Sequence, residues 1–141
     1  MMTEKEKVLF LCTGNSCRSQ MAEGWLRYLS GDRFQAYSAG IEAHGKNPRA
    51  IAVMREAGVD ISAQASEVLD MELLKTIDLL ISVCGHADAH CPMVPAQCRK
   101  AHWPFDDPAK ATGSEEQVLT AFRCVRDEIR ARIEQFLNTK D

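Results

Sequence analysis

The chain has 141 residues, of which 45% are hydrophobic, and it carries a formal net charge of −3 at pH 7. This length suits one domain, residues 1–141, built around a single hydrophobic core. No basic cluster indicates a nucleic-acid partner, and no apolar run is long enough to cross a membrane. Because the charged N-terminal residues MMTEKEK lack the apolar segment of a secretion signal, we expect a cytoplasmic protein.

The first half of the chain predicts strands that alternate with helices. Residues 7–12, KVLFLC, form a short apolar run that indicates a buried strand. Residues 19–29 place apolar side chains at helical spacing, and residues 34–39 predict a second strand. A further helix begins at Pro48, a residue that suits the first turn, and ends at Gly58.

The second half continues the alternation. A short helix is expected near residues 71–75, before a third strand at residues 78–84. Residues 100–105 predict a weaker fourth strand, which Pro104 confines to an edge or an end of the sheet. The last helix spans about residues 114–138, where apolar side chains recur every three or four positions.

This alternation predicts an α/β fold, in which helices flank a four-stranded parallel sheet with right-handed connections. The economical strand order is 2-1-3-4, which puts the first strand beside the third. Ligands bind such sheets at the carboxyl ends of the strands, where the connections diverge. Cys12 ends the first predicted strand and Cys84 ends the third, so we expect both cysteines at this edge.

The loop after the first strand reads CTGNSCR, which is C-x5-R between a strand and a helix. Gly14 and Asn15 tolerate left-handed backbone, so the loop can turn successive N–H groups inward as an anion-binding nest. Arg18 offers a planar fork for two oxygens of an oxyanion, and the helix N-terminus adds N–H groups. The same field favours the thiolate form of Cys12, to which Ser19 could donate a hydrogen bond. The predicted oxyanion-binding residues are Thr13, Gly14, Asn15, Ser16, Cys17, Arg18 and Ser19.

Cys12 is therefore interpreted as a nucleophile aimed at the central atom of a bound oxyanion. The alternative is that Cys12 is a small buried residue that ends a strand, with Arg18 in solvent. The position of the motif between a strand and a helix favours the catalytic interpretation. Cys17, inside the loop, is interpreted as a packing residue.

The segment CTGNSCRS followed by QMAEGW resembles the phosphate-binding loop of the low-molecular-weight protein tyrosine phosphatase superfamily. It is more similar still to the thioredoxin-coupled arsenate reductases of that superfamily. Four other segments resemble the same family, so the similarity covers nearly the whole chain: YSAGIEAHG at 37–45, NP at 47–48, HWPFDDP at 102–108 and RCVRDEI at 123–129. Pro104, in place of a glycine, and Cys98 depart from the family pattern.

An acid is needed because the oxygen displaced by a thiolate leaves far better once it is protonated. The segment FDDP supplies Asp106 and Asp107 just after the fourth strand. The resemblance implies that the general acid is the aspartate before proline, which is Asp107. Asp106 is interpreted as a turn residue or a supporting residue.

The six cysteines, at positions 12, 17, 84, 91, 98 and 124, suggest catalysis, redox chemistry or metal binding in a cytoplasmic protein. Neighbouring strands lie about 4.8 Å apart, and a disulfide needs Cα atoms about 4.4–6.8 Å apart, so Cys84 can reach Cys12. The resemblance implies a relay through Cys12–Cys84 and then Cys84–Cys91 disulfides. In it Cys12 takes arsenate, Cys84 releases arsenite, Cys91 attacks Cys84, and thioredoxin reduces the last disulfide.

Two alternatives remain open at this point. A low-molecular-weight protein tyrosine phosphatase would use Cys12, Arg18 and Asp107 alone, but residues 109–113, AKATG, offer no aromatic wall for a phenol ring. A metal-binding module would use Cys84, His86, His90 and Cys91, in a spacing that is not a familiar zinc pattern.

For the ligands and partners, we expect arsenate as substrate, phosphate or sulfate as competing oxyanions, and thioredoxin as the electron donor. No metal and no tightly bound cofactor is expected, and the chain is expected to act as a monomer. The resemblance also indicates a monovalent-cation site near Asn15, Glu23 and Ser38. Glu67 stands where the family has an aspartate, so whether a cation binds here stays an open question.

Overall fold

The computed structural model describes residues 5–15, 17–89 and 94–139. Its four strands form one parallel sheet in the order β2-β1-β3-β4, which confirms the predicted order. The strands are β1 (Glu6–Cys12), β2 (Phe34–Gly40), β3 (Leu79–Ser82) and β4 (Arg99–His102). β4 lies at an edge of the sheet and ends before Pro104, as the missing N–H of proline predicts.

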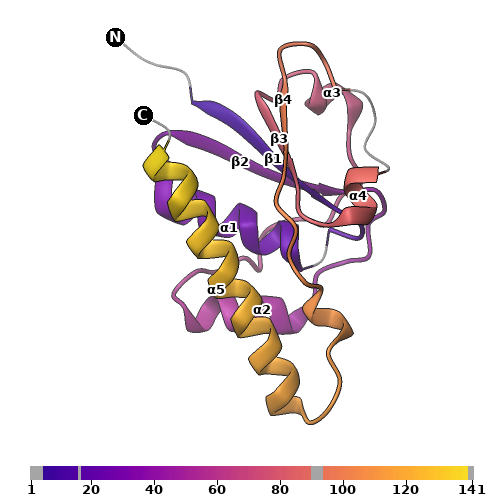
Figure 1. Cartoon of the computed structure of the whole chain (residues 1–141), viewed down its shortest axis with the longest axis vertical. Helices are drawn as coiled ribbons and strands as arrows, with labels where there is room; N and C mark the ends of the chain where they lie inside the picture. Colours follow the sequence, from indigo (N-terminus) through magenta and orange to yellow (C-terminus); the bar gives the residue numbers. More distant parts are fainter. Residues whose placement is uncertain (1–4, 16, 90–93, 140–141) are drawn as a thin grey trace.

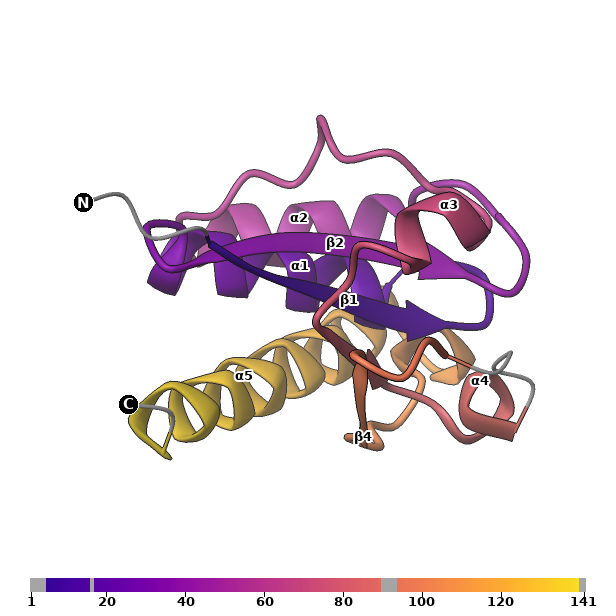
Figure 2. The same ribbon diagram turned by 90° about the horizontal axis from the view of Figure 1, so that it is seen from above.

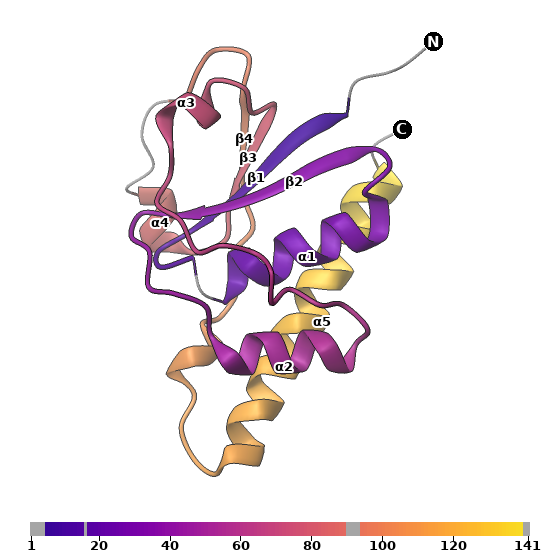
Figure 3. The same cartoon turned by 180° about the vertical axis from the view of Figure 1, so that it is seen from behind.

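The long helices gather on one side of the sheet and the short α3 lies on the other side (Figures 1 and 2). The helices are α1 (Arg18–Ser30), α2 (Pro48–Glu56), α3 (Met71–Leu74), α4 (Gly85–Ala89) and α5 (Glu115–Thr139), with a 3-10 turn η1 (Pro108–Lys110). Figure 3 shows from behind that α1 and α2 both pack against α5, with α2 crossing it. Within the described ranges, no helix is both long and apolar enough to cross a membrane.

Burial of β1 and of one stripe of α5 explains this arrangement. Residues 8–12 are all buried, because β1 is a central strand with neighbours on both sides. The predicted apolar stripe of the last helix is the buried face of α5 at Val118, Phe122, Val125, Ile129 and Ile133, whereas its last member, Phe136, is half-buried. At the start of α2, the Asn47 side chain accepts backbone N–H bonds from Arg49 and Ala50, so the helix begins at Pro48 as predicted.

The predicted third strand is too long. β3 ends at Ser82, so Cys84 follows the strand by two residues instead of ending it. Val83 still donates its N–H to the Leu11 carbonyl at 2.9 Å, and the chain then turns into α4. The sequence did not predict α4 or η1, because short polar segments carry no apolar periodicity.

Candidate active site

The loop between β1 and α1 lies at the carboxyl edge of the sheet and is tied to the segment after β2. The carbonyls of Cys12, Thr13 and Gly14 accept N–H bonds at 3.1, 2.8 and 2.9 Å from that segment. In a planar trans peptide the N–H points opposite to the carbonyl, so the loop N–H groups point away from this segment. That is the orientation that an anion nest requires.

Two positions in the loop need special backbone freedom or space. Asn15 is fully buried and has a φ of +50°, in the left-handed region that asparagine tolerates. At Gly14 a Cβ would lie 2.3 Å from His44 Nδ1, so a larger residue would require this imidazole to move. The sequence-based prediction of a left-handed loop is therefore confirmed at Asn15. Ser16, another predicted loop residue, lies outside the described residues.

Cys12 ends β1, is only 3% exposed, and has a polar partner from α1. Its sulfur lies 2.8 Å from Ser19 Oγ, and Ser19 Oγ lies 2.8 Å from Asn15 Oδ1. The Asn15 amide nitrogen faces the carbonyls of Ala65 and Glu67 at 3.5 and 3.4 Å, which directs Oδ1 to Ser19. The structure thus brings together the predicted nucleophile and the predicted hydroxyl partner.

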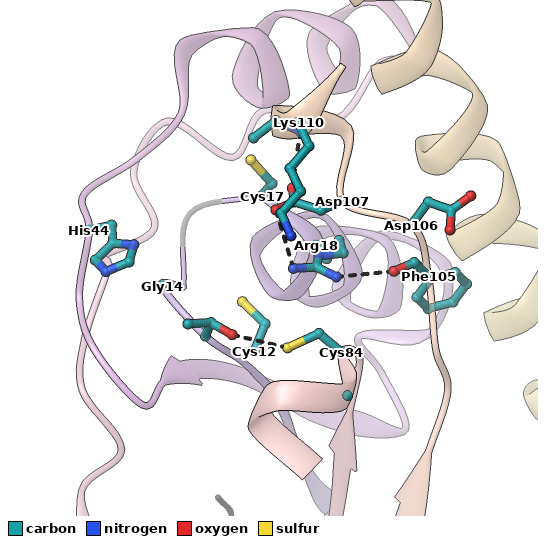
Figure 4. Close-up of a pocket in the computed structure, with 13 residues that line it drawn as sticks. Cys12, Gly14, Cys17, Arg18, His44, Cys84, Phe105, Asp106, Asp107 and Lys110 are labelled. Carbon is teal, nitrogen blue, oxygen red and sulfur yellow. Dashed lines mark hydrogen bonds and ion pairs between the residues drawn. The ribbon is translucent and has the colours of Figure 1, made fainter. Parts of the chain in front are cut away.

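Arg18 opens α1 and is held on the far side of the site from Cys12 (Figure 4). Its Nη1 donates to the Phe105 carbonyl at 3.0 Å, and its Nη2 lies 3.6 Å from Asp107 Oδ2. The other Asp107 oxygen accepts the Ala109 N–H at 3.0 Å and so caps η1. Asp106 points away from Cys12 in the same view. Both aspartates line the cavity above Cys12, and the contact with Arg18 is made by Asp107.

Cys84 lies beside the same loop, from the turn between β3 and α4. Its sulfur is 3.2 Å from Thr13 Oγ1 and accepts the Ala87 N–H at 3.4 Å, and the residue is 5% exposed. Leu11 pairs with Ser82, and Cys12 lies one residue beyond this pair while Cys84 lies two residues beyond it. Figure 4 shows the two sulfur atoms on neighbouring side chains.

Among the described cysteines, Cys12, Cys84 and Cys124 are free thiols. Cys91 lies outside the described residues, as does His90. Among the described residues, no group of three or more histidine, cysteine or acidic side chains is arranged to hold a metal ion. Both predicted disulfides therefore stay predictions.

A cavity of about 700 Å³ opens above Cys12, within the size range of small-molecule sites. Besides the predicted residues it is lined by His44, Phe105 and Lys110, which sequence reasoning missed. Lys110 lies two residues after the Asp-Pro pair, and this closeness to the predicted acid could have indicated that Lys110 borders the site. Its long side chain extends toward Arg18 in Figure 4, so two cations border the cavity.

The predicted cation site is formed only in part. Glu23 is buried, accepts the Ser38 hydroxyl at 2.5 Å and pairs with Arg27. Both Glu23 and Ser38 line a small cavity of about 110 Å³ together with Glu67, whereas Asn15 is not among its described lining residues. The oxygen donors suit a hard cation, but Arg27 already neutralises Glu23. The donor set therefore fits a cation only partly.

Comparisons with known proteins agree with this geometry. The family model for low molecular weight phosphotyrosine protein phosphatase matches residues 7–141. The arsenate reductase of Bacillus licheniformis is 56% identical over 135 residues, covering 96% of this chain and 97% of the relative. That of Bacillus subtilis is 52% identical over 136 residues, covering 96% and 98%. A solved arsenate reductase in the phosphate-binding state has a TM-score of 0.78 at 34% identity, covering 96% of this chain and 99% of that one.

The sheet order and the cysteine–arginine loop are thus those of a known class of enzymes. The chain belongs to the low molecular weight phosphotyrosine protein phosphatase family, and within it to the arsenate reductases. The sequence-based resemblance is confirmed for both the family and the fold.

Proposed function

We propose that the protein reduces arsenate to arsenite in the cytoplasm, for arsenic detoxification, with electrons from thioredoxin. The observation that supports this most is the position of Cys84, whose sulfur lies 3.2 Å from Thr13 Oγ1 in the Cys12 loop. A phosphatase needs one cysteine, whereas a reductase needs a second thiol nearby, because two thiols supply two electrons when they form a disulfide. Two arsenate reductases that are more than 50% identical in sequence to this chain support the same activity.

In the first step, the Cys12 thiolate attacks the arsenic atom of a bound arsenate. Arg18 and the loop N–H groups hold the arsenate oxygens, and Lys110 adds positive charge at the cavity. Asp107 gives a proton to the departing oxygen, which leaves as water. The product is a covalent bond between Cys12 and an arsenic atom that is still pentavalent.

In the second step, the Cys84 thiolate attacks the Cys12 sulfur of this adduct. A sulfur–sulfur bond forms and the sulfur–arsenic bond breaks, and the electron pair of the broken bond stays on arsenic. Arsenic leaves as trivalent arsenite, while Cys12 and Cys84 become a disulfide. The transfer of two electrons from two thiols therefore balances the reduction of arsenic.

In the third step, the Cys91 thiolate attacks the Cys84 sulfur, and Cys12 leaves as a thiolate. This exchange moves the disulfide to Cys84–Cys91 without a net change in oxidation state. A thioredoxin dithiol then reduces that disulfide and becomes oxidised itself. No step of this cycle passes through a metal or a bound cation. We further propose that the chain acts as a monomer. Phosphate or sulfate competes with arsenate for the same loop.

The experiment that tests this function measures arsenate-dependent NADPH oxidation in the presence of thioredoxin and thioredoxin reductase. Hydrolysis of an aryl phosphate is measured beside it, because Cys12, Arg18 and Asp107 would suffice for slow phosphatase activity. Cys12→Ser should lose both activities. Cys84→Ser should lose arsenite production but keep any aryl phosphate hydrolysis.

The matched control is Cys124→Ser, which removes an exposed cysteine on α5 and should behave as the wild type. Sustained arsenate turnover by Cys84→Ser would contradict the proposed cysteine relay. Rapid hydrolysis of aryl phosphate by a wild type that does not reduce arsenate would establish the tyrosine phosphatase alternative instead.

A further inference from the structure

A hydrogen-bonded cluster lies next to the site and joins three elements that the proposed reaction does not use directly. Ser82 ends β3, His102 ends β4, and Asp88 belongs to α4. Ser82 Oγ lies 2.9 Å from Asp88 Oδ1 and 2.8 Å from His102 Nδ1. Ser82 is fully buried, and its pairing with His102 in the sheet register brings the two side chains together.

The chemistry of these groups gives the hydrogen bonds a direction. An ionised carboxylate only accepts hydrogen bonds, so the single Ser82 proton goes to Asp88. The Ala101 carbonyl is a poorer acceptor for that proton, at 3.4 Å. His102 Nδ1 must then be the donor to Ser82. The Lys100 ammonium, 4.0 Å from Asp88 Oδ1, adds charge from the same edge strand.

Cys84 lies inside the ring that this contact closes. The hydrogen bond between Ser82 and Asp88 spans five intervening residues, and Cys84 is one of them. The Asp88 N–H also donates to the Cys84 carbonyl at 3.1 Å, and the Ala87 N–H donates to the Cys84 sulfur. Both ends of the turn that carries the thiol are therefore fixed to one another.

This tie matters because α4 is too short to be stable by itself. A helix of five residues has hardly more than one turn, and isolated helices of that length do not persist in water. Contacts with the rest of the protein must hold it. The bond from the buried Ser82 to Asp88 is a side-chain contact that anchors α4 to the sheet.

We infer that Ser82 and Asp88 are positioning residues for Cys84: they hold α4 against β3 so that the Cys84 sulfur faces the Cys12 loop. The inference rests on the proposed function in one respect: the position of Cys84 matters because Cys84 attacks the Cys12 adduct. Its expected signature is unusual. A loosened turn should expose Cys84 to outside reagents while it slows the attack of Cys84 on its neighbour.

The test compares Asp88→Ala, Ser82→Ala and Asp88→Asn with the wild type. One measurement is single-turnover arsenite formation, and the other is the alkylation rate of Cys84 by iodoacetamide in the reduced protein without arsenate, mapped by peptide mass. Both alanine variants should slow arsenite formation by about tenfold or more, since misplacement of a reacting group is costly. Both should also speed the alkylation of Cys84, and not that of Cys12.

Asp88→Asn retains an acceptor oxygen for Ser82, so it should stay close to the wild type in both measurements. Asp88 lies in the first turn of α4, where a negative charge also stabilises a helix, and Asp88→Asn removes this charge but keeps the acceptor, so it separates the two effects. The matched control is Glu72→Ala, which removes an exposed acid from α3 and should change neither rate.

The outcomes separate the two proposals. A wild type that makes no arsenite would overturn the proposed function, while the alkylation rates would still test the tie. Unchanged Cys84 alkylation in both alanine variants would overturn the positioning role. So would equal losses in Asp88→Asn and Asp88→Ala, because the retained acceptor would then be irrelevant.

Discussion

At the scale of single residues, one hydroxyl proton links the buried amide of the loop to the nucleophile. Ser19 has a single proton but two close partners, Asn15 Oδ1 and the Cys12 sulfur, each at 2.8 Å. When Cys12 is a thiol, it can donate to Ser19 while Ser19 donates to Asn15. When Cys12 is ionised, the Ser19 proton must turn to the sulfur, because a thiolate only accepts. Rotation of one hydroxyl therefore lets Ser19 donate to either partner.

The two adjacent aspartates provide a prediction at the same scale. Asp107 Oδ2 lies 3.6 Å from Arg18 Nη2, whereas the Asp106 side chain points away from Cys12, so we expect Asp107 to protonate a departing oxygen. Asp107→Asn should slow the first chemical step by about a hundredfold or more, the usual loss for a general acid. Titration with phosphate should show that oxyanion binding is largely kept.

Asp106→Asn is the matched control and should be nearly neutral in the same rapid-quench measurement of adduct formation. A larger defect in Asp106→Asn than in Asp107→Asn would reverse the assignment of the acid.

At the scale of elements, ion pairs connect α2 to α5 across the helical layer. Arg123 of α5 contacts Glu56 of α2 through Nε at 2.9 Å and Nη2 at 3.0 Å. Arg49 and Glu115 form a second pair of the same kind, through Nη2 at 2.7 Å. These hydrogen bonds from Arg123 and Arg49 hold the pKa values of Glu56 and Glu115 below the usual glutamate range.

A carboxyl pKa that is lower in the folded state than in the unfolded state makes the free energy of unfolding depend on pH, with a known sign. The stabilisation is fully present above the unfolded-state value of 4.5 and is lost as the pH falls through the lowered folded-state value. Glu56→Gln should therefore be less stable than the wild type near neutral pH. The difference in the free energy of unfolding should vanish in acid, as measured by urea titration at both pH values.

Because these side chains are in solvent, the difference should be small and should shrink in high salt. Glu72→Gln, on α3, is the control for the loss of an exposed acid. A stability difference for Glu56→Gln that persists at low pH and in high salt would mean that packing, not the ion pair, is responsible.

At the scale of the whole molecule, the parallel sheet gathers the reacting groups at one edge. The carboxyl end of β1, the turn after β3, the start of α1 and the turn η1 all border the cavity above Cys12 (Figure 4). Parallel strands that all point the same way make this convergence unavoidable. Cys12, Cys84 and Asp107 come from segments far apart in the sequence, yet they line one cavity.

This convergence gives a prediction for the complete cycle. Cys91→Ser should form one equivalent of arsenite and then stop, because nothing exchanges with the Cys12–Cys84 disulfide. Mass mapping of the stopped protein should identify that disulfide, and thioredoxin should reduce it poorly, since both cysteines are nearly buried. Continuous thioredoxin-driven turnover by Cys91→Ser would contradict the third step.

The sequence by itself determined the strand order, the position of the loop and the family. Each of these depends on local signals: an apolar run that ends at Cys12, a cysteine and an arginine six residues apart, and a helical stripe in the last 25 residues of the fold. Asp107 was indicated as the acid only by the resemblance to the family, because two adjacent aspartates look alike until the backbone direction is known. Ser16 and Cys91, outside the described residues, stay predictions.

The tertiary structure alone decided which of these residues touch and what surrounds them. The contact of Thr13 with Cys84 joins residues 71 positions apart, and that of Arg18 with the Phe105 carbonyl joins residues 87 apart. Periodicity reports only which face of an element is buried, so it could not predict such contacts. For the same reason it missed α4, a helix of five residues that is too short to be stable without contacts to the rest of the protein.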